Sequence, residues 1–152
     1  MTSTAPPYIR AATPGDRAAV EALLRASDLP VDGIPASLES FLVAERDDAV
    51  VGVIGLECYG ADALLRSAAV LPALRGTGLG ARLVDGIMAQ AETRGIDVLW
   101  LLTTTAERWF PRFGFAVAAR TDVPVTVQAS REFRGACPST ATIMRRAARP
   151  PR

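Results

Sequence analysis

Hydrophobic residues recur along the chain with two different spacings, which separate predicted helices from predicted strands. Between residues 79 and 91 they return every three or four positions, and this spacing predicts an amphipathic helix from about Gly78 to Thr93. A second helix is expected after Thr13-Pro14-Gly15-Asp16, because a capping Thr, an early Pro and an acidic residue three positions on are typical of a helix start. Its predicted buried stripe is Val20, Leu23 and Leu24.

Short apolar runs bounded by turn residues predict the strands. They cover residues 8–10, 41–45, 50–59, 63–70, 98–102, 116–120 and 140–145. The turns at 46–48 and 60–62 are short enough to join successive strands as hairpins. Thr104-Thr105-Ala106-Glu107 resembles a capping box and predicts a short helix that ends before Gly114. Residues 123–130 are a further candidate helix, and 29–37 is a predicted loop that contains Pro30, Gly33 and Pro35.

Length and composition predict a single globular domain over residues 1–152, with 1–7 and 147–152 frayed, because 49% of the residues are hydrophobic and 22% are charged. A net charge of +1 gives no general reason to expect a nucleic acid or an anionic membrane as partner. No apolar run reaches the ~18–20 residues that span a bilayer. Residues 1–7 lack the basic start and apolar stretch of a secretory signal, so a cytoplasmic location is expected.

The cysteine and histidine content argues against a metal centre. The chain contains no His, and its two cysteines, Cys58 and Cys137, lie far apart in sequence, so no metal site is predicted. Cys58 shares a strand face with Ile54 and Leu56 and is expected to be a buried thiol. Cys137 precedes Pro138 in a predicted loop and is expected to be the more accessible of the two.

The most specific feature is the glycine-rich stretch Arg75–Ala81 between a predicted strand and the long helix. Glycines at such a turn let the backbone approach a ligand, and the N–H groups of the new helix can bind an anion. A nucleotide P-loop requires Gly-Lys-Ser/Thr, and the chain contains no lysine. The dinucleotide fingerprint is matched by Gly76, Gly78 and Ala81, but the acidic Asp97 precedes the next strand instead of following it. A turn of purely structural use is the remaining alternative.

The same stretch resembles the R/Q-x-x-G-x-G/A loop of the GNAT acyltransferase superfamily, matched by Arg75, Gly78 and Gly80. Residues 103–115, which end in Gly-Phe, are similar to the family's second conserved segment. The resemblance implies the GNAT fold, an α/β (α+β) architecture with a mixed central sheet of roughly six to seven strands, about four helices and two splayed central strands. Homodimers are common in that family, so a homodimer is a further expectation.

The resemblance also implies acetyl-CoA as the acyl donor, with its pyrophosphate on the glycine-rich loop and its pantetheine paired with the backbone of the preceding strand. The positions that it assigns to acetyl-CoA are Ala68, Val70, Arg75, Gly76, Thr77, Gly78, Leu79, Gly80, Thr103 and Phe110. Many GNAT enzymes carry a Tyr four residues before the Gly of Gly-Phe, where it protonates the departing sulfur. Here that residue is Phe110, which has no proton to give. The thiolate then leaves unassisted, or with help from water or a hydroxyl of 103–105.

Acetyl transfer requires a neutral acceptor amine, and the absence of His removes the commonest general base. Glu57 on the strand 50–59 is the candidate base, acting directly or through water, and the alternative is a carboxylate paired with an Arg. Arg66 lies in an otherwise apolar run and must pair with a carboxylate, either of the substrate or of the protein. Ser67, Tyr59 and Arg131 are the other candidates for substrate contact.

Several stretches resemble one GNAT branch more closely, the arsenic-resistance-associated N-acetyltransferases. They are Gly55-Leu56-Glu57, Leu65-Arg66-Ser67, 101–105, Val123-Pro124, Arg131-Glu132-Phe133 and Cys137-Pro138. This resemblance implies transfer of acetyl to the primary amine of a small, carboxylate-bearing, amino-acid-like substrate, in arsenic or toxin resistance. Two other functions stay open: acetylation of a protein or peptide amine, and binding of CoA with little turnover, which Phe110 suggests.

Overall fold

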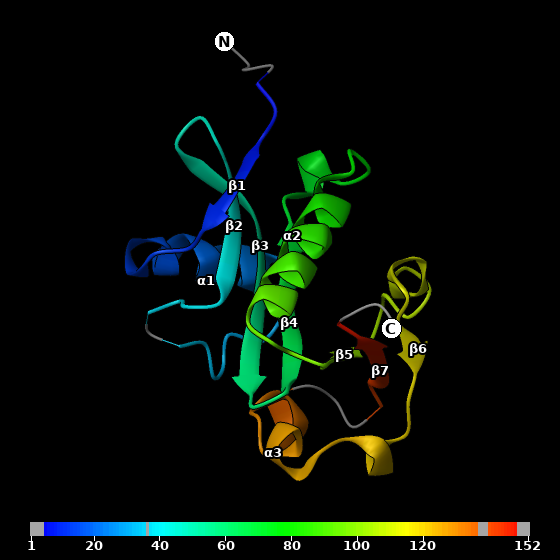
Figure 1. Cartoon of the computed structure of the whole chain (residues 1–152). Coiled ribbons are helices and arrows are strands. Elements are labelled where there is room, and N and C mark those ends of the chain that lie inside the picture. The colour runs from blue at the N-terminus through cyan, green and yellow to red at the C-terminus, as the bar shows by residue number, and fades with distance from the viewer. Residues whose placement is uncertain (1–4, 36, 137–139, 149–152) are drawn as a thin grey trace. The chain divides into compact units, whose positions relative to one another are not determined.

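Seven β-strands form a mixed sheet, as predicted. The computed structural model describes every residue except 1–4, 36, 137–139 and 149–152. The strands hydrogen-bond in the order β1-β2-β3-β4-β5-β7-β6 (Figure 1). They are β1 (Tyr8–Ala11), β2 (Phe41–Arg46), β3 (Ala49–Tyr59), β4 (Asp62–Val70), β5 (Val98–Thr103), β6 (Ala116–Val117) and β7 (Thr142–Ala147). β4 and β5 are parallel, whereas β1 with β2, β2 with β3, β5 with β7 and β6 with β7 are antiparallel.

Three α-helices accompany the sheet in the described part of the chain, where the resemblance implied about four helices. They are α1 (Arg17–Ala26), α2 (Leu79–Thr93) and α3 (Val125–Gln128). The helix predicted from Thr104 is wrong. The hydroxyl of Thr103 instead accepts the N–H of Ala106 at 2.9 Å, and only a 3-10 turn, Phe110–Phe113, follows before Gly114. Because Gly114 has φ 92°, it ends the turn before an α-helix can form.

The strand predicted over 116–120 is shorter than expected, because Ala119 begins a 3-10 turn (Arg120–Asp122) in which its N–H donates to Asp122. The frayed C-terminal end was predicted to begin at residue 147, yet Ala147 lies in β7 and the N–H of Ala148 donates to the carbonyl oxygen of Asp97 at 2.9 Å. The rest of that predicted end, 149–152, lies outside the described residues, as do residues 1–4.

The chain divides into two compact units. The first comprises Met1–Gly55 with Ser67–Ile87, and the second comprises Leu56–Arg66 with Met88–Arg152. The prediction of a single domain stays a prediction. Among the described residues, no helix has the length and apolar character that a membrane crossing requires.

In the first unit, helices cover both faces of the β2–β3 hairpin. Val20, Leu23 and Leu24 of α1 are buried, as predicted, in a cluster with Phe41 and Val43. The next residue along β2 after Phe41 points to the opposite face, because side chains alternate along a strand. There, the side chain of Leu42 approaches Gly86 of α2 so closely that a Cβ at Gly86 would lie 3.2 Å from it.

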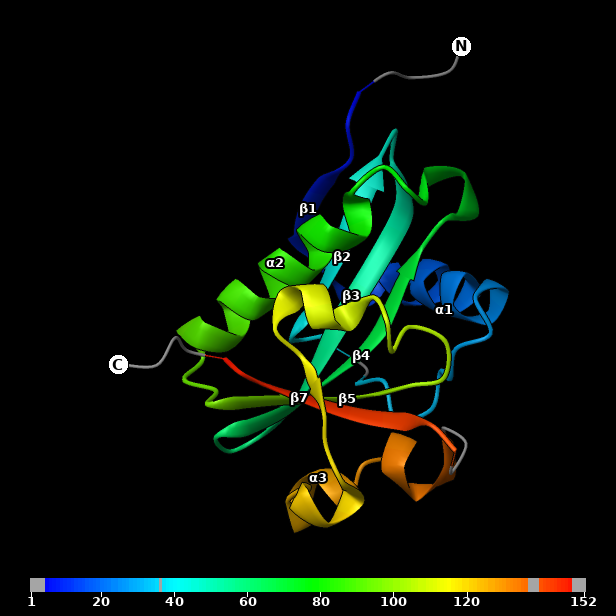
Figure 2. The same ribbon diagram turned by 90° about the vertical axis from the view of Figure 1, so that its right-hand side faces the viewer.

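In the second unit, α3 packs against β5 and β7 (Figure 2). The cluster contains Leu64, Trp100, Val123, Val127 and Ile143. The Trp100 indole N–H donates to Asp62 at 2.9 Å, which fixes the start of β4 beside β5. The registered β4–β5 pairs run only from Asp62–Val98 to Leu64–Trp100, although both strands continue beyond them. This early end of pairing agrees with the expected splay of two central strands.

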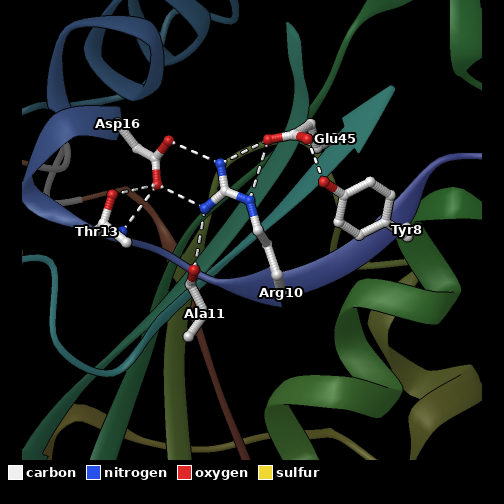
Figure 3. A network of polar contacts seen from close by, with 6 residues as sticks. All are labelled: Tyr8, Arg10, Ala11, Thr13, Asp16 and Glu45. Carbon is white, nitrogen blue, oxygen red and sulfur yellow. Dashed lines mark hydrogen bonds and ion pairs between the residues drawn. The ribbon is translucent and has the colours of Figure 1, made fainter. Parts of the chain in front are cut away.

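An Arg-centred network joins β1 to its neighbours in the first unit (Figure 3). The guanidinium of Arg10 donates to both oxygens of Asp16, at 2.8 and 2.9 Å, and to Glu45 at 2.8 Å. Tyr8 donates its hydroxyl to the same Glu45 carboxylate. Asp16 also accepts the backbone N–H of Thr13 at 2.8 Å, so the predicted acidic residue at the helix start is tied to β1 as well.

Gly55→Ala should destabilise the first unit. A Cβ at residue 55 would lie 2.4 Å from the ring of Phe41, which is opposite Gly55 in the β2–β3 register and is 1% exposed. We expect a loss of about 1–3 kcal/mol in the free energy of unfolding, measured by urea titration. Gly15→Ala is the control, because its Cβ would be 3.7 Å from the nearest atom. Equal stability of the two variants would contradict this packing.

Asp16 should contribute stability that depends on pH. Hydrogen bonds from Arg10, more than any other cause, lower the pKa of the Asp16 carboxyl from 3.8 to about 2. Because the folded pKa is depressed, the contribution is complete above pH ~4 and is lost as the pH falls through about 2. Wild type should therefore exceed Asp16→Asn by about 1–2 kcal/mol at neutral pH, after allowance for solvent screening.

Urea unfolding at a series of pH values measures this difference. The gap between wild type and Asp16→Asn should close between pH 4 and pH 2. Asp85→Asn, at an exposed position of α2, is the control and should show no such closing. A gap that is constant down to pH 2 would show that the Arg10–Asp16 ion pair contributes no stability.

Candidate functional site

The glycine-rich turn opens α2 in the first unit, as predicted. Gly76 and Gly78 have φ 81° and 88°, which L side chains rarely adopt. A Cβ at either glycine would meet no atom within 4 Å, so these positions border open space. The first helical hydrogen bond runs from the N–H of Arg82 to the carbonyl oxygen of Gly78 at 3.1 Å. The N–H groups of 79–81 therefore have no acceptor within the helix and form an anion-binding helix start.

The side chains around this turn hold its shape. Leu79 is 2% exposed, which anchors the first residue of α2 in the core and leaves its backbone at the turn. Thr77 donates its hydroxyl to the carbonyl oxygen of Leu74 at 2.5 Å, and Arg75 donates from Nε to the carbonyl oxygen of Val70 at 3.3 Å. Gly80 is half-buried on the first turn of α2. The predicted loop residues are thus brought together, and their interactions with acetyl-CoA stay a prediction.

The end of β4 lies beside this turn in the chain and carries the positions predicted for the pantetheine. The N–H of Leu71 donates to the carbonyl oxygen of Val51 on β3 at 2.9 Å. Because backbone groups alternate between the two edges of a strand, those of Val70 and Ala68 point to the edge away from β3. Both residues are half-buried. This geometry supports the predicted backbone contact at the splayed edge, although Arg75 already uses the Val70 carbonyl.

Thr103 and Phe110 belong to the second unit. Thr103 ends β5, and its hydroxyl caps the following turn by accepting the N–H of Ala106. Phe110 is 6% exposed and packs edge-on against Trp109 and Phe115, with ring centroids 5.0 and 5.6 Å apart. Phe110 is thus part of an aromatic cluster. The Thr103 hydroxyl has a structural partner in addition to any role beside a departing sulfur.

A polar centre on β3 and β4 lies in the second unit and contains Glu57, Tyr59 and Arg66. The guanidinium of Arg66 donates to one oxygen of the Glu57 carboxylate, and the hydroxyl of Tyr59 donates to the other. Arg66 is the more deeply buried partner, because its side chain is 0% exposed whereas that of Glu57 is 12% exposed. Of the two alternatives for Arg66, the structure contains the internal salt bridge. For Glu57, pairing with an Arg was the alternative to a role as general base, and the structure contains this pair.

Glu132 adds a second carboxylate to this polar centre. It lies in the helical turn Glu132–Ala136 and is 5% exposed. Burial is the largest cause that raises the pKa of Tyr59, followed by the hydrogen bond to Glu57, and the charge of Glu132 raises it further. The phenol therefore stays protonated and acts as a donor over the physiological range. Glu132 was not among the predicted site residues, because no periodicity marks a residue in an irregular turn.

The remaining candidates are scattered. Ser67 is 7% exposed with φ 60°, an uncommon backbone conformation for a residue inside a strand, and it belongs to the first unit. Arg131 is exposed. The expectation for Cys58 is wrong: its thiol is exposed, because the packing that buries Ile54 and Leu56 does not extend to the end of β3. Cys137 lies outside the described residues. Within the described part of the chain, no group of three or more His, Cys, Asp or Glu could hold a metal ion.

Comparison with known proteins shows the family of the chain. A family model described as "Acetyltransferase (GNAT) domain" matches residues 37–117, more than half of the chain. An amino-acid acetyltransferase from Ralstonia nicotianae is 31% identical over 128 residues, which cover 77% of this chain and 28% of that protein. The chain spans less than a third of the length of the curated amino-acid acetyltransferases that it matches.

Solved structures share the fold. N-acetylglutamate synthase from Neisseria gonorrhoeae, complexed with coenzyme A and N-acetyl-glutamate, matches 98% of this chain and 37% of its own, with TM-score 0.81 and 24% identity. A Mycobacterium tuberculosis protein in complex with CoA matches 93% of this chain and 99% of its own, with TM-score 0.78 and 22% identity. At these identities the likeness shows the fold, and the fold class predicted from the sequence is confirmed.

Gly78→Ala should weaken the binding of acetyl-CoA. The methyl group would enter the open space above the turn and would strain a residue at φ 88°. We expect the dissociation constant of acetyl-CoA, measured by calorimetry, to rise about tenfold or more. Gly60→Ala is a matched control, because Gly60 has φ 68° and equally open surroundings but lies in the β3–β4 turn. If both variants bound acetyl-CoA equally well, the glycine-rich turn would not be the donor site.

Proposed function

Because the chain belongs to the GNAT acetyltransferase family, we propose that it transfers the acetyl group of acetyl-CoA to the primary amine of a small, amino-acid-like acceptor. The observation that supports this most directly is the glycine-rich turn at the start of α2, whose N–H groups are suited to a diphosphate. In the reaction, the acceptor nitrogen forms a C–N bond to the acetyl carbon as the C–S bond breaks. An ammonium acceptor yields an amide, the free CoA thiol and one proton.

An amino acid is the favoured acceptor, and glutamate is the first to test. The curated relatives are named amino-acid acetyltransferases, and the gonococcal relative was solved with N-acetyl-glutamate. Their names describe longer proteins, so the acceptor of this chain is part of the proposal. The arsenic-resistance branch stays a prediction, since the curated relatives are named for the acetylation of amino acids and not for arsenic. A cytoplasmic location and a homodimer also stay predictions.

The leaving-group side needs no protein acid. Phe110 offers no proton, and its ring is packed between two aromatic neighbours. A thiol with a pKa near ~8.5 is a tolerable leaving group as the thiolate near neutral pH. The deprotonation and placement of the acceptor amine then become the demanding part of the reaction.

Free CoA thiol should be released when the protein is mixed with acetyl-CoA and an amino-acid acceptor. The panel contains glutamate, other amino acids, glutamate analogues that carry phosphorus or arsenic, and peptides with a free N-terminus. We expect turnover with at least one small amino-acid-like acceptor, and little with peptides. The acetylated product should be identified by mass spectrometry.

A reaction without acceptor corrects for hydrolysis, and Gly78→Ala tests whether turnover needs the donor turn. Tight binding of acetyl-CoA without thiol release for any acceptor would instead indicate a CoA-binding protein with little turnover. Turnover with peptides alone would indicate a protein N-acetyltransferase.

A further inference from the structure

We propose that the polar centre of Glu57, Tyr59 and Arg66 binds the ammonium group of the acceptor at the Glu57 carboxylate, with Arg66 and Tyr59 as positioning residues. This inference rests on the proposed function and names what one part of the site recognises. It differs from an acceptor site in which Arg66 contacts a substrate carboxylate.

The burial of Arg66 decides which chemical group the centre offers to a ligand. Its side chain is 0% exposed, and its guanidinium donates to Glu57. A substrate carboxylate would have to displace a carboxylate that is already in place and would need access to a guanidinium that solvent does not reach. A buried charge whose partner is removed is strongly destabilised, so this exchange is unfavourable.

Glu57 is the charged member of the pair that reaches the surface. Its side chain is 12% exposed, and each carboxylate oxygen has lone pairs beyond the one that its protein donor uses. Tyr59 donates to Glu57 and stays protonated, so it holds the carboxylate in place without competing for a cation. A ligand group that binds here must therefore donate hydrogen bonds and carry positive charge, as a primary ammonium does.

Glu132 makes the centre more acidic. With Glu57 and Glu132 ionised and Arg66 protonated, the formal charge of these groups is −1, and Glu132 is 5% exposed. The charge of Glu132 raises the pKa of Tyr59, so Glu132 lies within electrostatic reach of the hydroxyl that donates to Glu57. The charges of two carboxylates and one buried guanidinium in this region favour a cationic ligand over an anionic one. A second acidic group on the acceptor must therefore be recognised elsewhere.

The chain contains a second cluster of the same composition, which provides a matched control. Tyr8 and Arg10 both donate to Glu45 in the first unit (Figure 3). Tyr59 and Arg66 donate to Glu57 in the same way in the second unit. Arg10 is 28% exposed and is also held by Asp16, so this cluster is an ordinary structural network at an edge strand. Neutralising each Arg–Glu pair as a double variant removes one positive and one negative charge together, and in both clusters one further carboxylate, Asp16 or Glu132, is retained.

The test compares the Glu57→Gln/Arg66→Met double variant with the Arg10→Met/Glu45→Gln double variant. Acetylation of glutamate, glutamine and isoglutamine is measured by thiol release, since these acceptors share an ammonium but differ in their carboxylates. We expect kcat/KM of the first variant to fall about 10- to 100-fold for all three acceptors, mainly through the KM of the amine. The KM of acetyl-CoA and all constants of the second variant should stay near the wild-type values.

Glu57→Gln alone keeps one oxygen to accept from Arg66 and replaces the other with an NH2 group that can donate to the Tyr59 hydroxyl. It should show the same loss, and Glu57→Asp should recover part of it. These single variants are informative if the double variant does not unfold cooperatively. A loss confined to acceptors with a particular carboxylate would show that Arg66 contacts that carboxylate, and the inference would be wrong. Unchanged kinetics in the Glu57 variants would also overturn it. Absence of thiol release by the wild type with every acceptor would instead overturn the proposed function.

Discussion

Burial of the Arg66 guanidinium constrains how β3 and β4 can meet in the second unit. A charge removed from water requires a partner of opposite sign and donors or acceptors that complete its shell. Glu57 on the neighbouring strand provides that partner, and Tyr59 fixes the second carboxylate oxygen. The ends of β3 and β4 are thereby tied together by polar contacts beside a cluster that contains Leu64, Trp100 and Ile143. A carboxylate that is needed to neutralise a buried Arg is also held rigidly, which is what a recognition group requires.

The two Tyr–Glu–Arg clusters show how burial changes the meaning of one set of residues. Around Arg10, the guanidinium is partly exposed and shared between Asp16 and Glu45, so its contacts cap a helix and fasten the edge strand β1. The Arg66 side chain is fully buried, and its partner Glu57 is the member of the ion pair that solvent reaches. Residue composition does not distinguish the two clusters. The difference lies in which member of the ion pair solvent reaches, and only the folded chain contains that information.

Much of the fold could be predicted because its signals are local. The period of α2, the capping residues Thr13 and Asp16, and the glycines of the turn at 75–80 each act over a few residues, and the structure confirms the elements that they predict. Local signals do not determine the features that depend on distant packing. Cys58 lies on the strand face that was predicted, but no packing neighbours bury its thiol. The partner of Arg66 depends on how β3 and β4 meet across their turn. Glu132 lies in an irregular turn, where no period applies.

The lack of a phenol at position 110 bears on both the departure of the thiol and the reaction of the acceptor amine. Phe110 has no proton to donate, so under the proposed function the CoA thiol, whose pKa is near ~8.5, departs as a thiolate. An α-amino group has a pKa of about 8, so most of an amino-acid acceptor arrives protonated at neutral pH. A carboxylate such as Glu57 attracts this charged form and also stabilises it, which strengthens binding without easing the loss of the proton. Under our proposal, Glu57 therefore captures the abundant ammonium, and the proton must still be lost to water before the amine can attack the acetyl carbon.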